Sequence, residues 1–322
     1  MSTSQVLDRT ISLYRSNFVL FAGIALLTPA LGLVAQLTQL AVLGQPVVPE
    51  PGKFDPLIMQ QYFLQVIISV GVGIVVYMIG TAFATSATIY AVSMVHLGKT
   101  TTIQESYRTV RPYFWRLLGL LIRVFFLAFW PIIAGYVMIF VMGFMIAASG
   151  RNPNSGIAIV AGIVVLLAVG VFLFGIPWLI VSLCRYALSV TACTLEKLPA
   201  KYSVVRSKFL SKGRKGGIFL IYFLYFLLSI ALTYGLQLPA LLANKIPWFS
   251  AGAHISIGSL VWIYVANFLG ATIAGPLATI AIALVYYDQR VRKEAFDLQL
   301  MMEAVGVAQP TQAHAQAAPS LG

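Results

Sequence analysis

The densest group of side chains able to do acid–base or ion-pair chemistry lies near the C-terminus, in the stretch LVYYDQRVRKEAFDLQLMMEA at residues 284–304. A long apolar run leads into it. Its charged residues are Asp288, Arg290, Arg292, Lys293, Glu294 and Asp297. Such a cluster can be a catalytic site, a clamp for a lipid headgroup or a partner, or the point where the chain leaves a membrane. On a continuous helix, Arg290–Glu294 and Lys293–Asp297 are four residues apart, so each can form an ion pair, and we favour the topological interpretation.

The rest of the chain has no catalytic or metal-ligating pattern. Only nine Asp and Glu occur in 322 residues, and they are scattered. The spacings of a His-x-x-x-His motif, a nucleophile elbow and a Walker-type phosphate loop are absent. Cys184 and Cys193 make no metal spacing with the three histidines, so we expect both to be small buried side chains. The sequence thus predicts no catalytic residue, no metal and no cofactor, and an intramembrane lipid-modifying enzyme is the least supported alternative.

The composition predicts lipid as the main solvent of this chain. It is 60% hydrophobic and 9% charged, with a mean hydropathy of +0.90, whereas a soluble domain carries roughly 25% charged residues. Apolar runs long enough to cross a bilayer, which takes about 20 residues, occur six times. They are approximately residues 18–43, 59–97, 117–149, 157–193, 216–243 and 252–287. We therefore expect an all-α polytopic membrane protein with six transmembrane helices.

Lys and Arg are distributed very unequally between the two sides that six spans define. Of the 21 Lys and Arg, only Lys53, Arg151 and Lys245 fall on the side opposite the N-terminus. The positive-inside rule then places both termini in the cytoplasm. Topology accounts for the net charge of +12, so the excess of cations is no indication of nucleic-acid binding.

A pattern of apolar residues occurs three times, each time before an outward span. Its copies are Leu7, Ile11, Tyr14 and Phe18; Ile103, Tyr107, Val110 and Phe114; and Leu198, Tyr202, Val205 and Phe209. This spacing lines one face of a helix. We predict a membrane domain over residues 1–304 that contains three hairpin repeats, each starting with a cytoplasmic amphipathic helix. The repeats cover about residues 4–98, 99–194 and 195–300, and a disordered tail is expected at 305–322.

Cations on these cytoplasmic segments are candidate contacts for anionic lipid or for a partner protein. An arginine follows the third apolar position in every copy, and SKFLSKGRKGG at 207–217 is the most basic stretch. Each cation near an anionic leaflet contributes about 1 kcal/mol. The candidate residues are Arg15, Arg111, Arg206, Lys208, Lys212, Arg214, Lys215, Arg290, Arg292 and Lys293. The apolar faces can pack on the protein's own spans or lie in lipid, and both interpretations stay open.

Two polar residues inside the spans are further candidates. Arg185 is a cation within an apolar run, which is a functional position by default, although it can also extend its charge to the cytoplasmic surface. Asn267 can line a cavity or form an interhelical hydrogen bond. Pro177 and Pro276 are natural kink points. These features support an alternative function as a small transporter or permease subunit whose path is lined by Arg185 and Asn267.

The two ends of the membrane region carry a family resemblance. VLDRTISLYRSNF (6–18) together with YYDQRVRKEAFDLQL (286–300) resembles the integral membrane domain that accompanies some bacterial glycerophosphoryl diester phosphodiesterases and also occurs alone. ESYRTV (105–110) and YSVVRSKF (202–209) add to a similarity over residues 5–300. In that family the phosphodiesterase chemistry belongs to a separate soluble barrel, whose His/Glu pattern this chain lacks.

Taken together, these patterns predict a multi-pass protein of the bacterial inner membrane. The expected function is a non-enzymatic accessory or scaffold module in lipid or envelope handling, which uses a basic cytoplasmic face. The expected partners are membrane lipids, preferably anionic, and a membrane protein is the open alternative. The sequence leaves the oligomeric state open.

Overall fold

The computed structural model describes residues 2–44, 56–148, 155–243 and 256–294, and every regular element in these ranges is helical. The helices are α1 (Thr3–Ser16), α2 (Phe18–Ala25), α3 (Leu27–Leu43), α4 (Pro56–His96), α5 (Ile103–Val110), η1 (Arg111–Tyr113), α6 (Phe114–Ala148), α7 (Ser155–Tyr186), α8 (Ser189–Leu195), α9 (Ala200–Ser211), α10 (Lys215–Ala243) and α11 (Ile257–Glu294). The predicted tail at 305–322 is outside the described residues, as are Asp297 and the cations Lys53, Arg151 and Lys245.

Six helical segments are long and apolar enough to cross a membrane, and they overlap all six predicted runs. Their bounds are Phe18–Leu43, Gln60–His96, Ile103–Val141, Gly162–Leu195, Lys215–Ala240 and Ile257–Glu294. The prediction of an all-α, multi-pass fold class is therefore confirmed. α4 has 41 residues and α11 has 38. At 1.5 Å per residue each is about 60 Å long, about twice the hydrocarbon thickness of a bilayer, so these helices must tilt or project from it.

The first predicted span is divided at Leu26, where α2 ends and α3 begins. Pro29 lies three residues beyond this break. Proline has no backbone N–H, so the carbonyl of Ala25 loses the donor that a continuous helix would give it. The hydropathy pattern does not detect this interruption, because both sides of the break are apolar.

The fourth predicted span is also divided, at residues 187–188 between α7 and α8. There the Ser189 hydroxyl donates to the carbonyl of Tyr186 at 2.6 Å, a local bond that competes with the helical pattern. Pro112 lies in the 3₁₀ turn η1, which separates α5 from α6. By contrast, α7 stays helical through Pro177 and α11 through Pro276.

The last span, α11, forms the centre of the protein. Of its most apolar window, 56% is buried inside the protein, against 11–17% for the other five spans. It packs against α1, α2, α3, α4, α8, α9 and α10. Its fully buried residues include Ile280, Leu284 and Tyr286, which belong to the main hydrophobic core.

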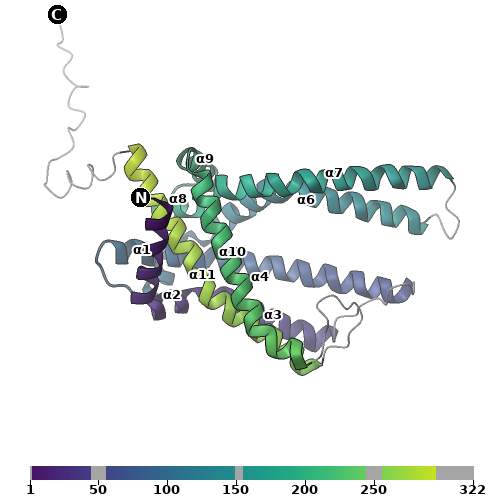
Figure 1. Cartoon of the computed structure of the whole chain (residues 1–322), viewed down its shortest axis with the longest axis horizontal. Helices are drawn as coiled ribbons and strands as arrows, with labels where there is room; N and C mark the ends of the chain where they lie inside the picture. Colours follow the sequence, from purple (N-terminus) through teal and green to yellow (C-terminus); the bar gives the residue numbers. More distant parts are fainter. Residues whose placement is uncertain (1, 45–55, 149–154, 244–255, 295–322) are drawn as a thin grey trace, which may run out of the picture.

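The short helices gather at one end of the molecule. Figure 1 shows α1, α8 and α9 around the C-terminal turns of α11, while α6 and α7 extend together away from them. We call this region, made of α1, α5, η1, α8, α9 and the last turns of α11, the basic end. The hydrophobic core lies against it, because core residues such as Val6, Val110, Val204 and Leu210 come from the short helices themselves.

Consecutive long helices pack in pairs: α3 with α4, α6 with α7, and α10 with α11. Small residues allow the close approach, as is usual between helices in lipid. A Cβ added at Gly135 would lie 3.0 Å from the Phe172 ring, and one added at Gly80 would lie 2.9 Å from the Thr28 Cα atom. The threefold repeat of hairpins stays a prediction.

The contact at Gly80 gives a test of this packing. The Gly80→Ala substitution should lower the free energy of unfolding by about 1–3 kcal/mol, because the added methyl group meets backbone rather than a movable side chain. The measurement is thermal unfolding in detergent, followed by tryptophan fluorescence. Gly71→Ala in the same helix is the matched control, since a Cβ at Gly71 meets nothing within 4 Å. Equal melting temperatures for the two variants would contradict the α3–α4 contact.

Candidate functional site

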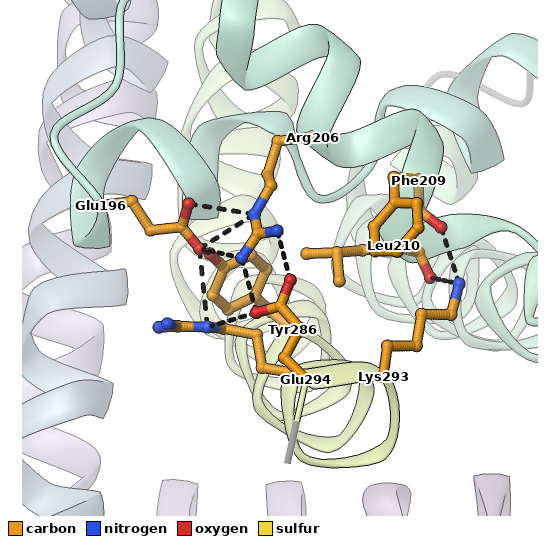
Figure 2. Close-up of polar contacts among 8 residues, drawn as sticks. Glu196, Arg206, Phe209, Leu210, Tyr286, Lys293 and Glu294 are labelled. Carbon is orange, nitrogen blue, oxygen red and sulfur yellow. Dashed lines mark hydrogen bonds and ion pairs between the residues drawn. The ribbon is translucent and has the colours of Figure 1, made fainter. Parts of the chain in front are cut away.

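Arg206 lies at the centre of an ion cluster at the basic end (Figure 2). Its Nη2 atom lies 2.9 Å from Oε1 of Glu196 and 2.6 Å from Oε2 of Glu294, and its Nε atom lies 3.0 Å from Oε2 of Glu196. The Nε atom of Arg290 is 3.5 Å from a carboxylate oxygen of each glutamate. The Tyr286 hydroxyl donates to Glu196 as well. Two guanidinium groups thus balance two carboxylates, so the cluster has no net charge.

The cluster joins elements that are far apart in sequence. Glu196 is the residue at which α8 ends, Arg206 lies on α9, and Glu294 is the last residue of α11. Their side chains are only 16–24% exposed. Burial alone would lower the pKa of Arg206, but hydrogen bonds to Glu294 and Glu196 outweigh it and hold this pKa above its ordinary value. Arg206 therefore stays charged and fixes α8 and α9 against α11.

Lys293 caps the C-terminal end of α9 (Figure 2). Its ammonium group donates to the carbonyls of Phe209, Leu210 and Lys212 at 2.6, 3.1 and 2.8 Å. A cation at this position compensates both the unpaired carbonyls and the negative end of the helix dipole. Gly213 follows with a φ of 88°, a conformation that glycine adopts at little cost, and the chain then enters α10.

The predicted pair Arg290–Glu294 is present, although its 3.5 Å separation makes it a weaker contact than those of Arg206. Lys293 was expected to pair with Asp297, which is outside the described residues. The structure adds another pair four residues apart, Arg292–Asp288 at 3.1 Å, in which the aspartate side chain is only 7% exposed. Four of the ten candidate lipid-contacting cations, Arg206, Arg290, Arg292 and Lys293, therefore hold contacts inside the protein.

The other candidate cations lie on or near the surface. Arg15, Arg111, Lys212 and Lys215 are exposed. Lys208 and Arg214 are half-buried, and the Lys208 ammonium lies 5.7 Å from the centre of the Tyr186 ring. Four of these six cations lie close together in sequence, with Lys208 on α9, Lys212 and Arg214 in the turn after it, and Lys215 at the start of α10. Arg15 is near the end of α1, and Arg111 is on η1.

The apolar pattern of α9 faces away from the rest of the protein. Tyr202, Val205 and Phe209 are 62%, 56% and 52% exposed. The inward face combines the core residues Val204 and Leu210 with hydroxyl-bearing residues such as Ser203 and Ser207. The Ser207 hydroxyl donates to the carbonyl of Arg185 at 2.9 Å, which holds α9 against the end of α7.

The first copy of the apolar pattern, on α1 and at the start of α2, is partly buried and partly exposed. Tyr14 is buried, and its hydroxyl donates to the carbonyl of Ile273 in α11 at 2.8 Å. Ile11 and Phe18 are exposed. Tyr107 of α5 makes a contact of the same kind, since its hydroxyl donates to the carbonyl of Ile24. The interpretation as packing thus fits parts of α1 and α5, and the outward orientation is clearest in α9.

The two polar candidates within the spans are in different places. Asn267 lines a cavity of about 760 Å³ between the spans, and its Oδ1 atom accepts from Nε2 of Gln237 at 2.9 Å. Arg185 is exposed in the last turn of α7, with its guanidinium 6.0 Å from the centre of the Tyr186 ring. It is not part of the described lining of this cavity. The path lined by both residues stays a prediction.

The acids of the ion cluster are engaged in contacts within the protein. Glu196 and Glu294 each accept hydrogen bonds from Arg206. Within the described ranges, no group of three His, Cys, Asp or Glu side chains is placed to hold a metal ion. Cys184 and Cys193 are both free and buried.

Comparisons with protein-family models, curated proteins and solved structures each found no match to this chain. The resemblance to the membrane domain of glycerophosphoryl diester phosphodiesterases therefore stays a prediction. Sequence analysis did not include Glu196 and Tyr286 in a site. The available signal was weak: Glu196 is one of few acids in a cation-rich connection, ten residues before Arg206.

The Arg206→Gln substitution should destabilise the protein by about 1–3 kcal/mol, because it leaves two partly buried carboxylates without their main partner. Lys201→Gln on the exposed face of the same helix is the control and should change stability little. Thermal unfolding of both variants in detergent provides the comparison. Adding Glu294→Gln to Arg206→Gln should cost less than the sum of the single changes. Additive losses would show that the two residues do not interact.

Proposed function

We propose that this chain is a non-enzymatic integral membrane protein, an accessory or scaffold module in lipid or envelope handling. In this proposal the basic end lies at the cytoplasmic surface of a bacterial inner membrane and binds anionic lipid. The three hairpin units would each place one amphipathic helix at that surface. The observation that carries the proposal is the outward face of α9, which combines exposed apolar side chains with cations.

The distribution of charge supports this proposal. The acids Glu196, Asp288 and Glu294 are paired with arginines within the basic end. Lys212 and Lys215 remain exposed nearby, and no salt bridge within the described ranges neutralises them. A surface of this kind attracts anionic headgroups, which provide the missing negative charge.

The exposed apolar residues explain why a membrane fits this surface better than a soluble anion. Tyr202, Val205 and Phe209 stand outward on α9. Amphipathic helices at the bilayer surface bury such side chains among the acyl chains near the headgroups, while neighbouring lysines extend their charge to the phosphates. Lys208 and Lys212 are placed for that role along the same helix end.

Charge reversal tests the lipid contact. Changing Lys208, Lys212, Arg214 and Lys215 to glutamate should reduce the retention of phosphatidylglycerol by at least about tenfold, because each lost cation removes about 1 kcal/mol. Native mass spectrometry of the protein released from vesicles of phosphatidylglycerol and phosphatidylcholine measures the bound lipids directly.

The matched control keeps the charge: lysine to arginine at Lys208, Lys212 and Lys215, with Arg214→Lys. This variant should retain the wild-type preference for phosphatidylglycerol. An unchanged lipid preference after charge reversal would reject the basic end as the lipid-binding surface. A stoichiometric protein that accompanies the wild-type chain when it is released from its own membranes would instead support the scaffold part of the proposal.

A small transporter is the second candidate function, because Asn267 lines a cavity within the spans. Single cysteines along α7 and α11, introduced after replacement of Cys184 and Cys193, separate the two functions. For a scaffold we expect a water-soluble thiol reagent to reach no continuous series of positions across the bilayer. A series that is labelled from one surface to the other, and protected by a solute, would favour transport.

A further inference from the structure

The cavity that contains Asn267 is formed where several spans meet. Its lining comes from the α2–α3 region, α4, the α7–α8 junction, α10 and α11. Along α11 it extends from Tyr264 to Ile282, a distance of roughly 27 Å for a helix. The volume of about 760 Å³ lies within the range of sites for small organic ligands.

The lining mixes polar and apolar side chains and carries no formal charge. Nearly half of its residues bear a hydroxyl or a side-chain amide, including Tyr77, Tyr222, Tyr225, Tyr264, Gln36 and Asn267. Asp, Glu, Lys, Arg and His are absent from the described lining. Apolar side chains such as Leu33 and Phe268 complete it. A charged ligand would be placed among spans without a counter-ion, which is costly, whereas a neutral group with hydroxyls or carbonyls finds partners.

Both interruptions of the spans border this cavity. Ala25 and Pro29 flank the α2–α3 break, and Ala187 and Thr191 flank the α7–α8 break, and all four residues line the cavity. Breaks in spanning helices expose backbone groups that need partners, and they are tolerated where they border a polar cavity or are buried in protein. The Ala25 carbonyl, which Pro29 deprives of its helical donor, is such a group.

Side chains at the cavity also have unused hydrogen-bonding capacity. The Thr191 hydroxyl is fully buried, and the described residues provide it with no partner. Asn267 uses its Oδ1 atom with Gln237, and the described residues provide no acceptor for its NH₂ group. Buried polar groups are normally satisfied, so the Thr191 hydroxyl needs a partner. Asn267 is only half-buried, and its NH₂ group can donate to a ligand in the cavity.

We infer that this cavity binds an uncharged, hydroxyl-bearing amphiphile of the diacylglycerol type. Its hydroxyl and ester groups would bond with the threonine, tyrosine and asparagine side chains, and its acyl portion would follow the apolar wall along α11. A free polyol has the same polar chemistry without the chains. This inference goes beyond the binding of anionic lipid at the basic end and does not depend on it.

Filling the cavity tests the inference. A Cβ at Gly73 meets nothing within 4 Å, and Gly73 lines the cavity, so Gly73→Leu places a side chain in the open space. The probe is dioleoylglycerol added to the full chain in detergent, with binding measured by native mass spectrometry. Wild type should retain one molecule, and Gly73→Leu should weaken retention by at least about tenfold. Gly71→Leu is the matched control, because Gly71 lies two residues away on α4, has equal space and is not part of the lining.

A second pair of variants changes chemistry without filling space. Thr191→Val removes the unpartnered hydroxyl and should weaken retention about three- to tenfold. Thr272→Val is its control, since the Thr272 hydroxyl already donates to the Phe268 carbonyl at 2.7 Å and Thr272 is not part of the lining. Both variants keep the side-chain shape, so folding is little disturbed.

Several outcomes would overturn the inference. Equal retention by Gly73→Leu and Gly71→Leu would reject the cavity as the site. If Gly73→Leu weakened the retention of phosphatidylglycerol as much as that of dioleoylglycerol, the selection of the cavity for neutral ligands would be rejected. If glycerol stabilised the protein but dioleoylglycerol was not retained, the ligand of the cavity would be a free polyol and not a lipid. Gly73→Leu should leave the anionic-lipid preference of the basic end unchanged. A failure of the proposed lipid contact at the basic end can therefore be distinguished from a failure of the cavity inference.

Discussion

The contact of Arg206 with Glu196 and Glu294 organises the basic end. It connects the end of α8, the middle of α9 and the last turn of α11. The three side chains are mostly buried. α8 in turn carries Thr191 to the wall of the cavity between the spans. A contact outside the apolar region therefore helps to set the shape of a cavity inside it, since both are attached to the same short helix.

Lipid is the solvent for most of the surface of this protein. Five of the six spans bury only a small part of their apolar windows, and their outward side chains are large and aliphatic. Such a surface would aggregate in water, but it costs nothing among acyl chains. The protein is consequently held together by small-residue contacts, tyrosine-to-carbonyl bonds and the ion cluster, and less by the burial of apolar area.

Much of the fold could be predicted from sequence because hydropathy averages over about twenty residues and tolerates local error. The six spans and the turn at Pro112 follow from such local patterns. The ion cluster could not be predicted, because Glu196 and Glu294 are far apart in sequence and meet only when α9 packs on α11. The apolar pattern of α9 was visible, but its outward orientation depends on Ser203 and Ser207 packing inward, which periodicity alone does not distinguish.

The central position of α11 has a consequence for biogenesis. A ribosome makes this helix after all the others, yet it is the helix on which most of them pack. The earlier spans can form the α3–α4 and α6–α7 pairs without it, but the faces that pack on α11 must be covered by lipid or by an insertion factor until it is made. Final assembly begins when the sixth span arrives, so chains whose synthesis stops before α11 would be substrates for membrane quality control.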